Sequence, residues 1–224
     1  MKHFIFLCSF LFLTSGIDAQ SSMDCSWTFD IGITERPSRI FYLTKLNSIS
    51  LCGKPDTIKK EMIYSAFVLY QCGEPNSLYE GDATCSYTIR HVKDTLIVQQ
   101  FHGIPNGKHM AVRWQAFYVT KFYFKKGQLY QTSYYRTDLK KYTNAQRAQV
   151  ISAYEKMEEP LMNDDKFLLM VNRLFWAFVS GSRQAEDCLN RLKVKYGNLD
   201  GAIGEEFDDL MMTYEDYKQR KDKM

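Results

Sequence analysis

The chain is poor in proline and glycine, with 5 and 12 of its 224 residues, and it contains no long low-complexity run. Its composition is 45% hydrophobic and 25% charged, which is typical of globular proteins. Collagen, coiled coil and intrinsic disorder are therefore excluded as its main state. Aromatic residues reach 15%, and a chain of this length buries a sizeable core without support from metals or disulfides.

Catalytic motifs are also missing. The sequence has no Walker loop, no GxGxxG or GxSxG motif, no HExxH pair and no EF-hand loop. It lacks Cys-x-x-Cys and Cys-x-x-His pairs as well, so a structural zinc site is not expected. We expect neither a cofactor nor a metal, and no motif in the sequence identifies a catalysed reaction.

The N-terminal residues have the pattern of an export signal. Lys2 supplies a positive start, residues 4–13 are apolar, and Ala19 fits the small residue before a cleavage site at Gln20. The apolar stretch is shorter than the roughly 20 residues of a membrane-spanning helix. We expect residues 1–19 to be a cleaved signal peptide, with an uncleaved anchor as the alternative. The mature chain is then secreted or periplasmic, with no transmembrane segment.

Signal cleavage leaves five cysteines, four of them in the N-terminal half of the mature chain. An oxidising compartment permits pairing, and we expect two disulfides among these four in one of three connectivities. A hairpin staple between Cys72 and Cys85 is reasonable because a turn-rich stretch lies between them. Cys188 lies in a helical pattern and is expected to be a buried, inert thiol. The disulfide candidates are Cys25, Cys52, Cys72 and Cys85.

The middle of the chain has the alternation and the β-branched and aromatic content of strands. Its strongest signal is a long run ending at Lys125-Lys126-Gly127, followed by a second run, which predicts a β-hairpin. We expect a meander of about five antiparallel strands. They are predicted within residues 62–71, 84–92, 94–102 and, as the hairpin, 111–136.

The hydrophobic period becomes helical after Thr143. Thr143 and Gln146 match a capping box, and the almost wholly apolar residues 167–179 predict a buried helix. Gly181 and Gly197 are expected helix stops. Helices are predicted over residues 144–158, 167–179, 182–196 and 205–220, and a short one over 38–51 from the spacing of Ile40, Leu43, Leu46 and Ile49.

Strands followed by helices predict an α+β fold. We expect an antiparallel sheet of about five strands (residues 60–137) packed against C-terminal helices (residues 144–221). No linker rich in proline, glycine or serine separates the sheet-rich residues 20–142 from the helical residues 143–221. A single domain over residues 20–224 is therefore predicted, with a separate four-helix C-terminal domain as the alternative.

Basic charge is concentrated in residues 88–142, which hold ten lysines and arginines and two acidic residues. In a strand over 112–124, alternation places the even-numbered residues in the core and the odd-numbered ones on an open face. Arginine and aromatic side chains are frequent anchors of protein interfaces. The candidate contact residues are Arg113, Phe117, Lys121, Tyr123, Tyr130, Tyr134 and Arg136.

These features indicate a non-enzymatic binding module of the bacterial envelope whose basic, aromatic sheet face contacts an acidic protein or an anionic envelope glycan. The simpler alternative is a solvated sheet face whose lysines limit edge aggregation. Basic residues among aromatics also resemble a nucleic-acid platform, but export and the lack of a nucleic-acid motif argue against one.

Two other functional hypotheses stay open. The first is a hydrolase that uses His91, His102 or His109 at strand ends, with Asp94 orienting the base. The second is a structural envelope component that docks through the acidic C-terminal helix 205–221. The oligomeric state is left unassigned.

Overall fold

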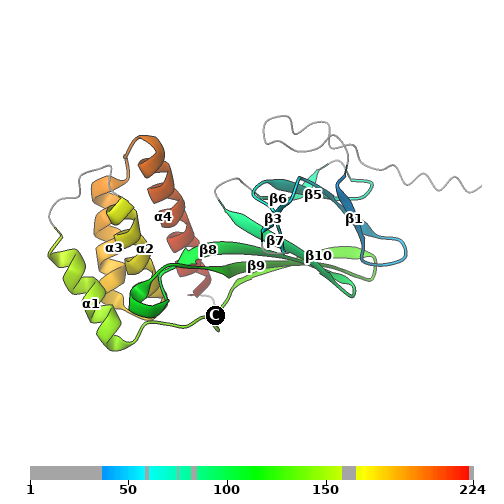
Figure 1. The fold of residues 1–224 in the computed structure, drawn as a ribbon. Helices are drawn as coiled ribbons and strands as arrows, with labels where there is room; N and C mark the ends of the chain where they lie inside the picture. Colours follow the sequence, from blue (N-terminus) through cyan, green and yellow to red (C-terminus); the bar gives the residue numbers. More distant parts are fainter. Residues whose placement is uncertain (1–36, 59–60, 75, 82–84, 158–164, 222–224) are drawn as a thin grey trace, which may run out of the picture.

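The computed structural model describes residues 37–58, 61–74, 76–81, 85–157 and 165–221. Two four-stranded antiparallel sheets and a two-stranded ribbon precede four helices (Figure 1), which confirms the predicted α+β fold. The prediction of one sheet of about five strands differs from the structure in the number of sheets, because the described residues before residue 82 form a four-stranded sheet of their own.

The first sheet has the strand order β1-β2-β5-β6. Its strands are β1 (Arg39–Tyr42), β2 (Ser48–Cys52), β5 (Phe67–Gln71) and β6 (Ser77–Gly81), and β3 (Asp56–Ile58) pairs with β4 (Glu61–Ile63) in the ribbon.

The predicted helix over residues 38–51 is wrong, because these residues form β1, a turn and β2. In the turn, Thr44 Oγ1 accepts hydrogen bonds from the backbone N–H groups of Leu46 and Asn47, at 3.3 and 3.0 Å. Leu46, which completed the helical spacing, is 91% exposed. The buried residues recur instead with a period of two, as in Ile49 and Leu51.

The second sheet is a meander with the order β10-β9-β8-β7. Gly127 (φ +78°) and Lys126 (φ +52°) form the two-residue turn of the predicted hairpin, which is confirmed. Positive φ at both positions suits the type I′ geometry that matches strand twist. The strands are β7 (Ser86–Val92), β8 (Thr95–Ile104), β9 (Arg113–Lys125) and β10 (Gln128–Tyr135), with a 3-10 turn at Lys108–Met110.

The two four-stranded sheets pack face to face around a shared hydrophobic cluster, which we call the sandwich core. Phe67, the first residue of β5, contacts the rings of Tyr64, Tyr79 and Tyr87, with centroids 5.2 to 5.9 Å apart. The principal buried residues are Phe41, Ile49, Leu51, Tyr64, Phe67, Leu69, Tyr87, Ile89, Leu96, Val98, Phe122 and Phe124.

The four helices form a second core, the helical core, around α2. The predicted capping box is confirmed: Thr143 Oγ1 accepts from the backbone N–H of Gln146, whose side chain accepts in return from the backbone N–H of Thr143. Ser182 caps α3, and residue 158, the predicted end of the first helix, lies outside the described residues. The helices are α1 (Asn144–Glu155), α2 (Asp165–Val179), α3 (Arg183–Tyr196) and α4 (Gly201–Lys221).

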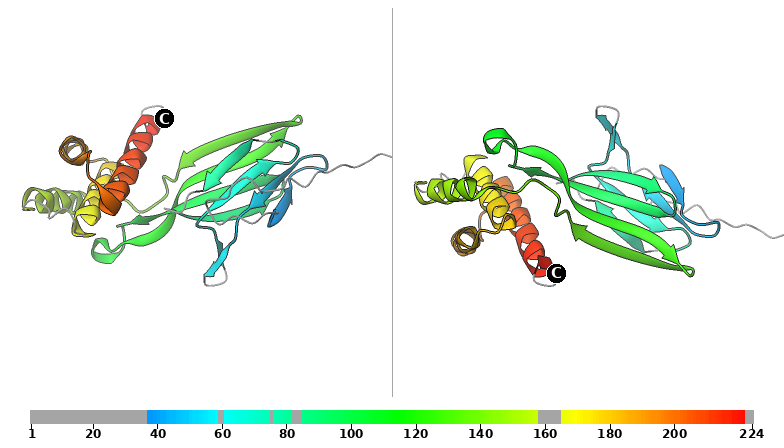
Figure 2. Two further views of the ribbon diagram at one scale, coloured as in Figure 1. Left: turned by 90° about the horizontal axis from the view of Figure 1, so that it is seen from above. Right: turned by 90° about the horizontal axis from the view of Figure 1, so that it is seen from below.

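Strands β8 and β9 are long enough to leave the sandwich and enter the helical half (Figures 1 and 2). A β-bulge lies at this transition, since Gln100 pairs with Tyr118 and Phe101 pairs with Ala116, leaving Phe117 as the extra residue. The bulge reverses the alternation along β9. Consequently Trp114, predicted to be in the core, is 65% exposed.

Candidate functional site

Four of the seven candidate contact residues share one face of the second sheet. Tyr123 lies opposite Tyr130, and Lys121 lies between this pair and Tyr134 in the register of β9 and β10. These side chains face away from Phe122 in the sandwich core, because successive residues of a strand point to opposite faces. We call Lys121, Tyr123, Tyr130 and Tyr134 the open sheet face.

The side chains of the open sheet face are held by contacts with one another. The rings of Tyr123 and Tyr130 are stacked, with centroids 5.7 Å apart and an interplanar angle of 13°. Lys121 Nζ lies 5.1 Å from the centroid of the Tyr134 ring, within the range of a cation–π contact. Tyr130 and Tyr134 are 40% and 42% exposed. A partner therefore meets aromatic surfaces whose rotamers are already restricted, which lowers the entropy cost of binding.

The same face continues across β8 and β7 without an acidic residue. The register places Ile97 opposite Lys121 and Arg90 opposite Ile97, so two basic side chains lie on neighbouring strands. Val92, which is half exposed, lies next to Arg90 on this face. The strands β7 to β10 themselves contain no aspartate or glutamate.

The other three candidates lie elsewhere. Phe117 is fully buried and contacts Trp176 and Tyr217, with ring centroids 5.7 and 5.9 Å away, so its prediction as a surface contact residue is wrong. Arg113 is exposed at the start of β9, beyond the bulge. Sequence alternation misplaced Phe117 because a bulge appears only in the strand register, for which the residues themselves give no signal.

Arg136 follows β10 and is engaged locally. Its guanidinium forms a 2.5 Å ion pair with Asp138 and donates to the carbonyl of Ala116. The hydrogen bond from Arg136 lowers the pKa of the Asp138 carboxyl below its usual value. Part of the positive charge of Arg136 is thereby compensated, and this residue contributes less than Lys121 to the field of the sheet.

His91, His102 and His109 do not come together. His91 pairs with Leu96 and packs edge-on against Phe41, whereas His102 packs against Phe117 at the helical end. Leu96 and His102 are six residues apart on β8, or about 20 Å at roughly 3.3 Å per residue. His109 is exposed in the 3-10 turn. The arrangement offers no shared catalytic pocket to these imidazoles.

The C-terminal helix is part of the helical core. Phe207, Tyr214 and Tyr217 of α4 are buried there. The Tyr135 hydroxyl donates a 2.7 Å hydrogen bond to Asp216, and Arg220 donates to the same carboxylate at 2.8 Å. Burial raises the pKa of Tyr135 well above its ordinary value, and the bond to Asp216 adds to this effect. The helix therefore anchors the helical half to β10.

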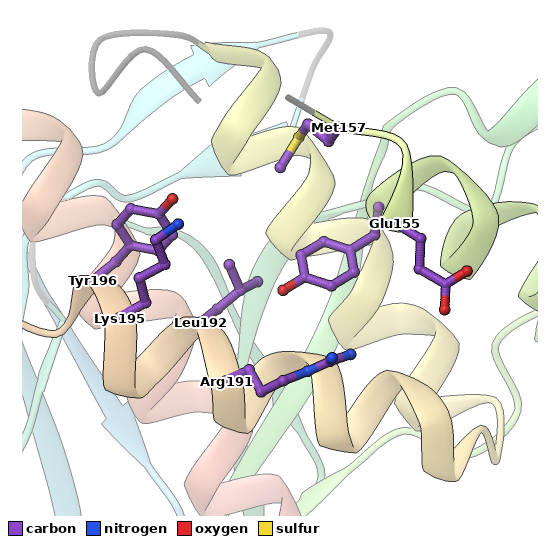
Figure 3. Close-up of a pocket in the computed structure, with 7 residues that line it drawn as sticks. Glu155, Met157, Arg191, Leu192, Lys195 and Tyr196 are labelled. Carbon is purple, nitrogen blue, oxygen red and sulfur yellow. The ribbon is translucent and has the colours of Figure 1, made fainter. Parts of the chain in front are cut away.

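A pocket of about 310 Å³ lies between α1 and α3, close to Cys188. Arg191 and Lys195 come from α3, and Glu155 comes from the end of α1 (Figure 3). Arg191 donates to the Cys188 sulfur at 3.2 Å, yet burial dominates and raises the pKa of this thiol. A protonated, buried thiol is a poor nucleophile, which agrees with the prediction of an inert Cys188.

Cys72, which follows β5, and Cys85, which precedes β7, depart from the expected pairing. Cys72 and Cys85 remain thiols, so the predicted staple between them is wrong, and no disulfide joins two described cysteines. The Cys85 sulfur instead accepts a hydrogen bond from Gln100 at 3.0 Å. Cys52 is buried in β2 and is disulfide-bonded. Cys25 lies outside the described residues.

Metal and membrane features are not found in the part of the chain that the structure describes. Within it, no three His, Cys, Asp or Glu side chains cluster in a way that holds a metal ion. None of the described helices combines the length and the hydropathy needed to cross a membrane. Comparison of the chain with protein-family models, with curated proteins and with solved structures found no match.

Proposed function

We propose that this protein is an exported, non-enzymatic binding module of the bacterial envelope that contacts an acidic protein through the open sheet face. The observation that carries the proposal is the pairing of Lys121 with Tyr134 beside the stacked Tyr123 and Tyr130, on a face that holds Arg90 and no acidic residue.

Two physical properties favour an acidic protein as the partner. Exposed tyrosines supply large, rigid contact areas with a polar tip, and they are enriched at the centres of protein interfaces. The cations of the face accelerate the approach of a negatively charged surface, an effect that weakens as salt screens the field. An anionic envelope glycan would share the electrostatic term and is distinguished from a protein by the experiment below.

Site-specific photo-crosslinking tests the location of the interface. A photoreactive phenylalanine analogue in place of Tyr134 is expected to capture an acidic protein in cells, identified by mass spectrometry. The matched control carries the analogue at Tyr42, which is 56% exposed on the first sheet. Equal capture from both positions, or capture only of carbohydrate at Tyr134, contradicts the proposal. Export is tested on the same material, whose N-terminus is expected at Gln20.

Charge reversal at Lys121 tests the electrostatic part. Lys121→Glu is expected to slow association with the captured protein about tenfold at low salt, with a smaller effect at high salt, because steering acts mainly on the association rate. Lys45→Glu, in the exposed turn between β1 and β2, is the matched control and should leave the rate unchanged. Surface plasmon resonance measures both, and an unchanged association rate for Lys121→Glu refutes this surface assignment.

A further inference from the structure

A second basic surface lies at the helical end of β9, away from the open sheet face. There the connection between β8 and β9 lies beside the start of α1 (Figure 1). The two segments involved, residues 104–115 and 139–149, contain five lysines and arginines and no aspartate or glutamate. We call these five residues the basic corner: Lys108, Arg113, Lys140, Lys141 and Arg147.

Hydrogen bonds hold the two segments against each other. The side-chain amide of Asn106 donates to the Lys140 carbonyl at 3.2 Å, and the Tyr142 hydroxyl donates to the Pro105 carbonyl at 2.6 Å. The Gln115 side chain donates to the side-chain oxygen of Asn106 at 2.5 Å, and Asn106 is only 6% exposed. The backbones that carry the cations are therefore fixed relative to each other.

The turn that carries Lys108 is ordered as well. His109 and Met110 adopt left-handed φ values of +54° and +57°, and Met110 is buried in the helical core. Gly107 comes so close to Arg113 that a Cβ atom at this glycine would lie 3.0 Å from the guanidinium Nε. The exposed side chains of Lys108 and Arg113 therefore start from one ordered turn.

The helices add positive charge to the basic corner. No acidic residue in the first turn of α1 offsets the positive end of its helix dipole. Arg147 donates from its guanidinium to the Ser180 carbonyl at 3.0 Å, which anchors this cation next to the end of α2. Burial raises the pKa of Tyr142, and the nearby Arg173 of α2 acts in the opposite direction. A further positive charge thus lies behind the corner.

The cations of the basic corner are not neutralised by the residues around them. All of them except Arg147 are exposed. No ion pair joins any of the five to another residue that the structure describes. The acid that precedes residues 139–149, Asp138, is engaged by Arg136. Together the five side chains form a field that attracts a multivalent anion.

The composition of the corner favours phosphate groups as that anion. Protein interfaces are depleted in lysine and enriched in aromatic side chains, whereas three of these five residues are lysines and none is aromatic. Single-stranded nucleic acids stack on exposed rings, and membrane surfaces take up apolar side chains. The exposed apolar residues of these segments, Val112 and Trp114, instead line a concavity next to α4. Phosphates suit guanidinium groups and helix N-termini.

We propose that the basic corner binds a flexible polymer with closely spaced phosphate groups. Successive phosphates contact Lys108 and Arg113 on the turn and then Lys140 and Lys141 before α1, and one approaches Arg147 at the start of this helix. The inference does not rest on the open sheet face or on the acidic protein proposed for it. The corner is a separate site for a different class of ligand.

Fluorescence anisotropy with a labelled linear polyphosphate tests this proposal on the full mature chain. Polyglutamate represents acidic proteins, oligothymidylate represents single-stranded nucleic acid, and phosphatidylglycerol vesicles represent membranes. We expect polyphosphate to bind at least tenfold more tightly than either other polymer, and the vesicles not to co-sediment the protein. The comparison with polyglutamate is made in the Lys121→Glu variant, so that binding at the open sheet face is not counted.

The probes also give the results that overturn the proposal. Binding of polyglutamate or oligothymidylate equal to that of polyphosphate, or co-sedimentation with the vesicles, overturns the assignment of the ligand. A failure of polyphosphate to bind overturns the site itself. Because the full mature chain is used, this failure includes the case in which acidic residues elsewhere in the chain neutralise the corner.

Matched double variants locate the binding. Lys140→Gln combined with Lys141→Gln is expected to weaken polyphosphate binding about tenfold, because two phosphate contacts are lost. Lys125→Gln combined with Lys126→Gln removes the same charge from an exposed lysine pair at the other end of β9 and should leave the affinity within about twofold. Thermal melts verify that both are folded. An equal loss in the two variants shows attraction by net charge alone and overturns the site.

Arg113 gives an independent test of the turn. Arg113→Gln is expected to weaken polyphosphate binding about fivefold, and an unchanged affinity for this folded variant removes the turn from the site and overturns the proposal. Lys121→Glu should leave the polyphosphate affinity unchanged, and Arg113→Gln should leave photo-crosslinking from position 134 unchanged. The two binding proposals can therefore fail separately.

Discussion

Strands β8 and β9 enter the sandwich core at one end and the helical core at the other, and the two ends are held differently. In the sandwich, Leu96 and Phe122 follow the regular alternation of a pleated strand and meet the first sheet. In the helical half, the bulge residue Phe117 meets rings from α2 and α4. One ribbon thus serves two cores because a single extra residue redirects its side chains.

Polar contacts differ between the two ends as well. In the sandwich, Thr120 and Ser133 share a neutral hydrogen bond of 3.0 Å across β9 and β10. At the helical end, Tyr135 donates to the charged Asp216, which also accepts from Arg220. Hydrogen bonds to charged groups contribute more than neutral ones, so the attachment of α4 depends more on polar chemistry than the sandwich does.

The largest expected effect is that of removing the ring of Phe117. Phe117→Ala should lower the free energy of unfolding by about 3–5 kcal/mol, because it leaves a cavity among packed aromatic rings. Phe122→Ala is the matched change in the sandwich core and should cost a similar amount. Urea unfolding is followed by circular dichroism and by tryptophan fluorescence. We expect coincident transitions in the wild-type protein; separate transitions would show that the two cores unfold independently.

Removal of the Tyr135 hydroxyl should have an intermediate effect. Tyr135→Phe is expected to lower stability by about 1.5–3 kcal/mol at neutral pH, because the buried hydroxyl donates to a charged carboxylate. Thr120→Val, its counterpart in the sandwich, should cost about 1 kcal/mol or less. Chemical denaturation measures both, and a larger loss for Thr120→Val would reverse the comparison.

The same tyrosine predicts alkaline instability. Burial raises the pKa of Tyr135 above the ordinary 10.0, so above pH 10 the folded state binds a proton that the unfolded state has released. Its contribution is present in full below pH 10 and falls by about 1.4 kcal/mol per pH unit above it. Tyr135→Phe should therefore flatten the decline of stability with pH between 10 and 11, and an unchanged slope would contradict this assignment.

The smallest expected effects come from local caps. Thr143→Ala removes the capping box of α1 and should cost about 1 kcal/mol. Thr44→Ala removes the hydroxyl that orders the turn between β1 and β2 and should cost about 0.5–1 kcal/mol. Thermal melts compare the two variants. A loss above about 2 kcal/mol in either would mean that the cap has contacts beyond its own element.

The helical half was predictable because its signals are local. Thr143 with Gln146, Ser182, and Gly181 at positive φ mark helix ends within a few residues of sequence. The hairpin at Lys126-Gly127 was predictable for the same reason. The first sheet was not, because Leu46 completes a helical spacing by chance. The competing turn is held by the Thr44 hydroxyl together with backbone hydrogen bonds to the Asn47 carbonyl, which leave no pattern in the sequence.

The candidate site was half predictable. Alternation places Lys121 and Tyr123 together on one face, and short-turn register adds Tyr130. It fails at Phe117, where the bulge changes the register. It also gives no sign of the concavity of about 790 Å³ that is lined by Trp114 of β9 and Glu206 of α4, residues more than 90 positions apart in sequence. Such long-range proximity has no signature in local periodicity.

The length of β8 and β9 has a consequence for the order of folding. Their hairpin closes through residues 105–112, so its contacts are local in sequence, while each core needs this ribbon as a wall. Elements whose contacts are close in sequence form fastest, and β-hairpins close in about 1–10 μs. We therefore expect this ribbon to be the folding nucleus. Substitutions in its centre should then slow folding, whereas those in the outer strands and helices should mainly speed unfolding.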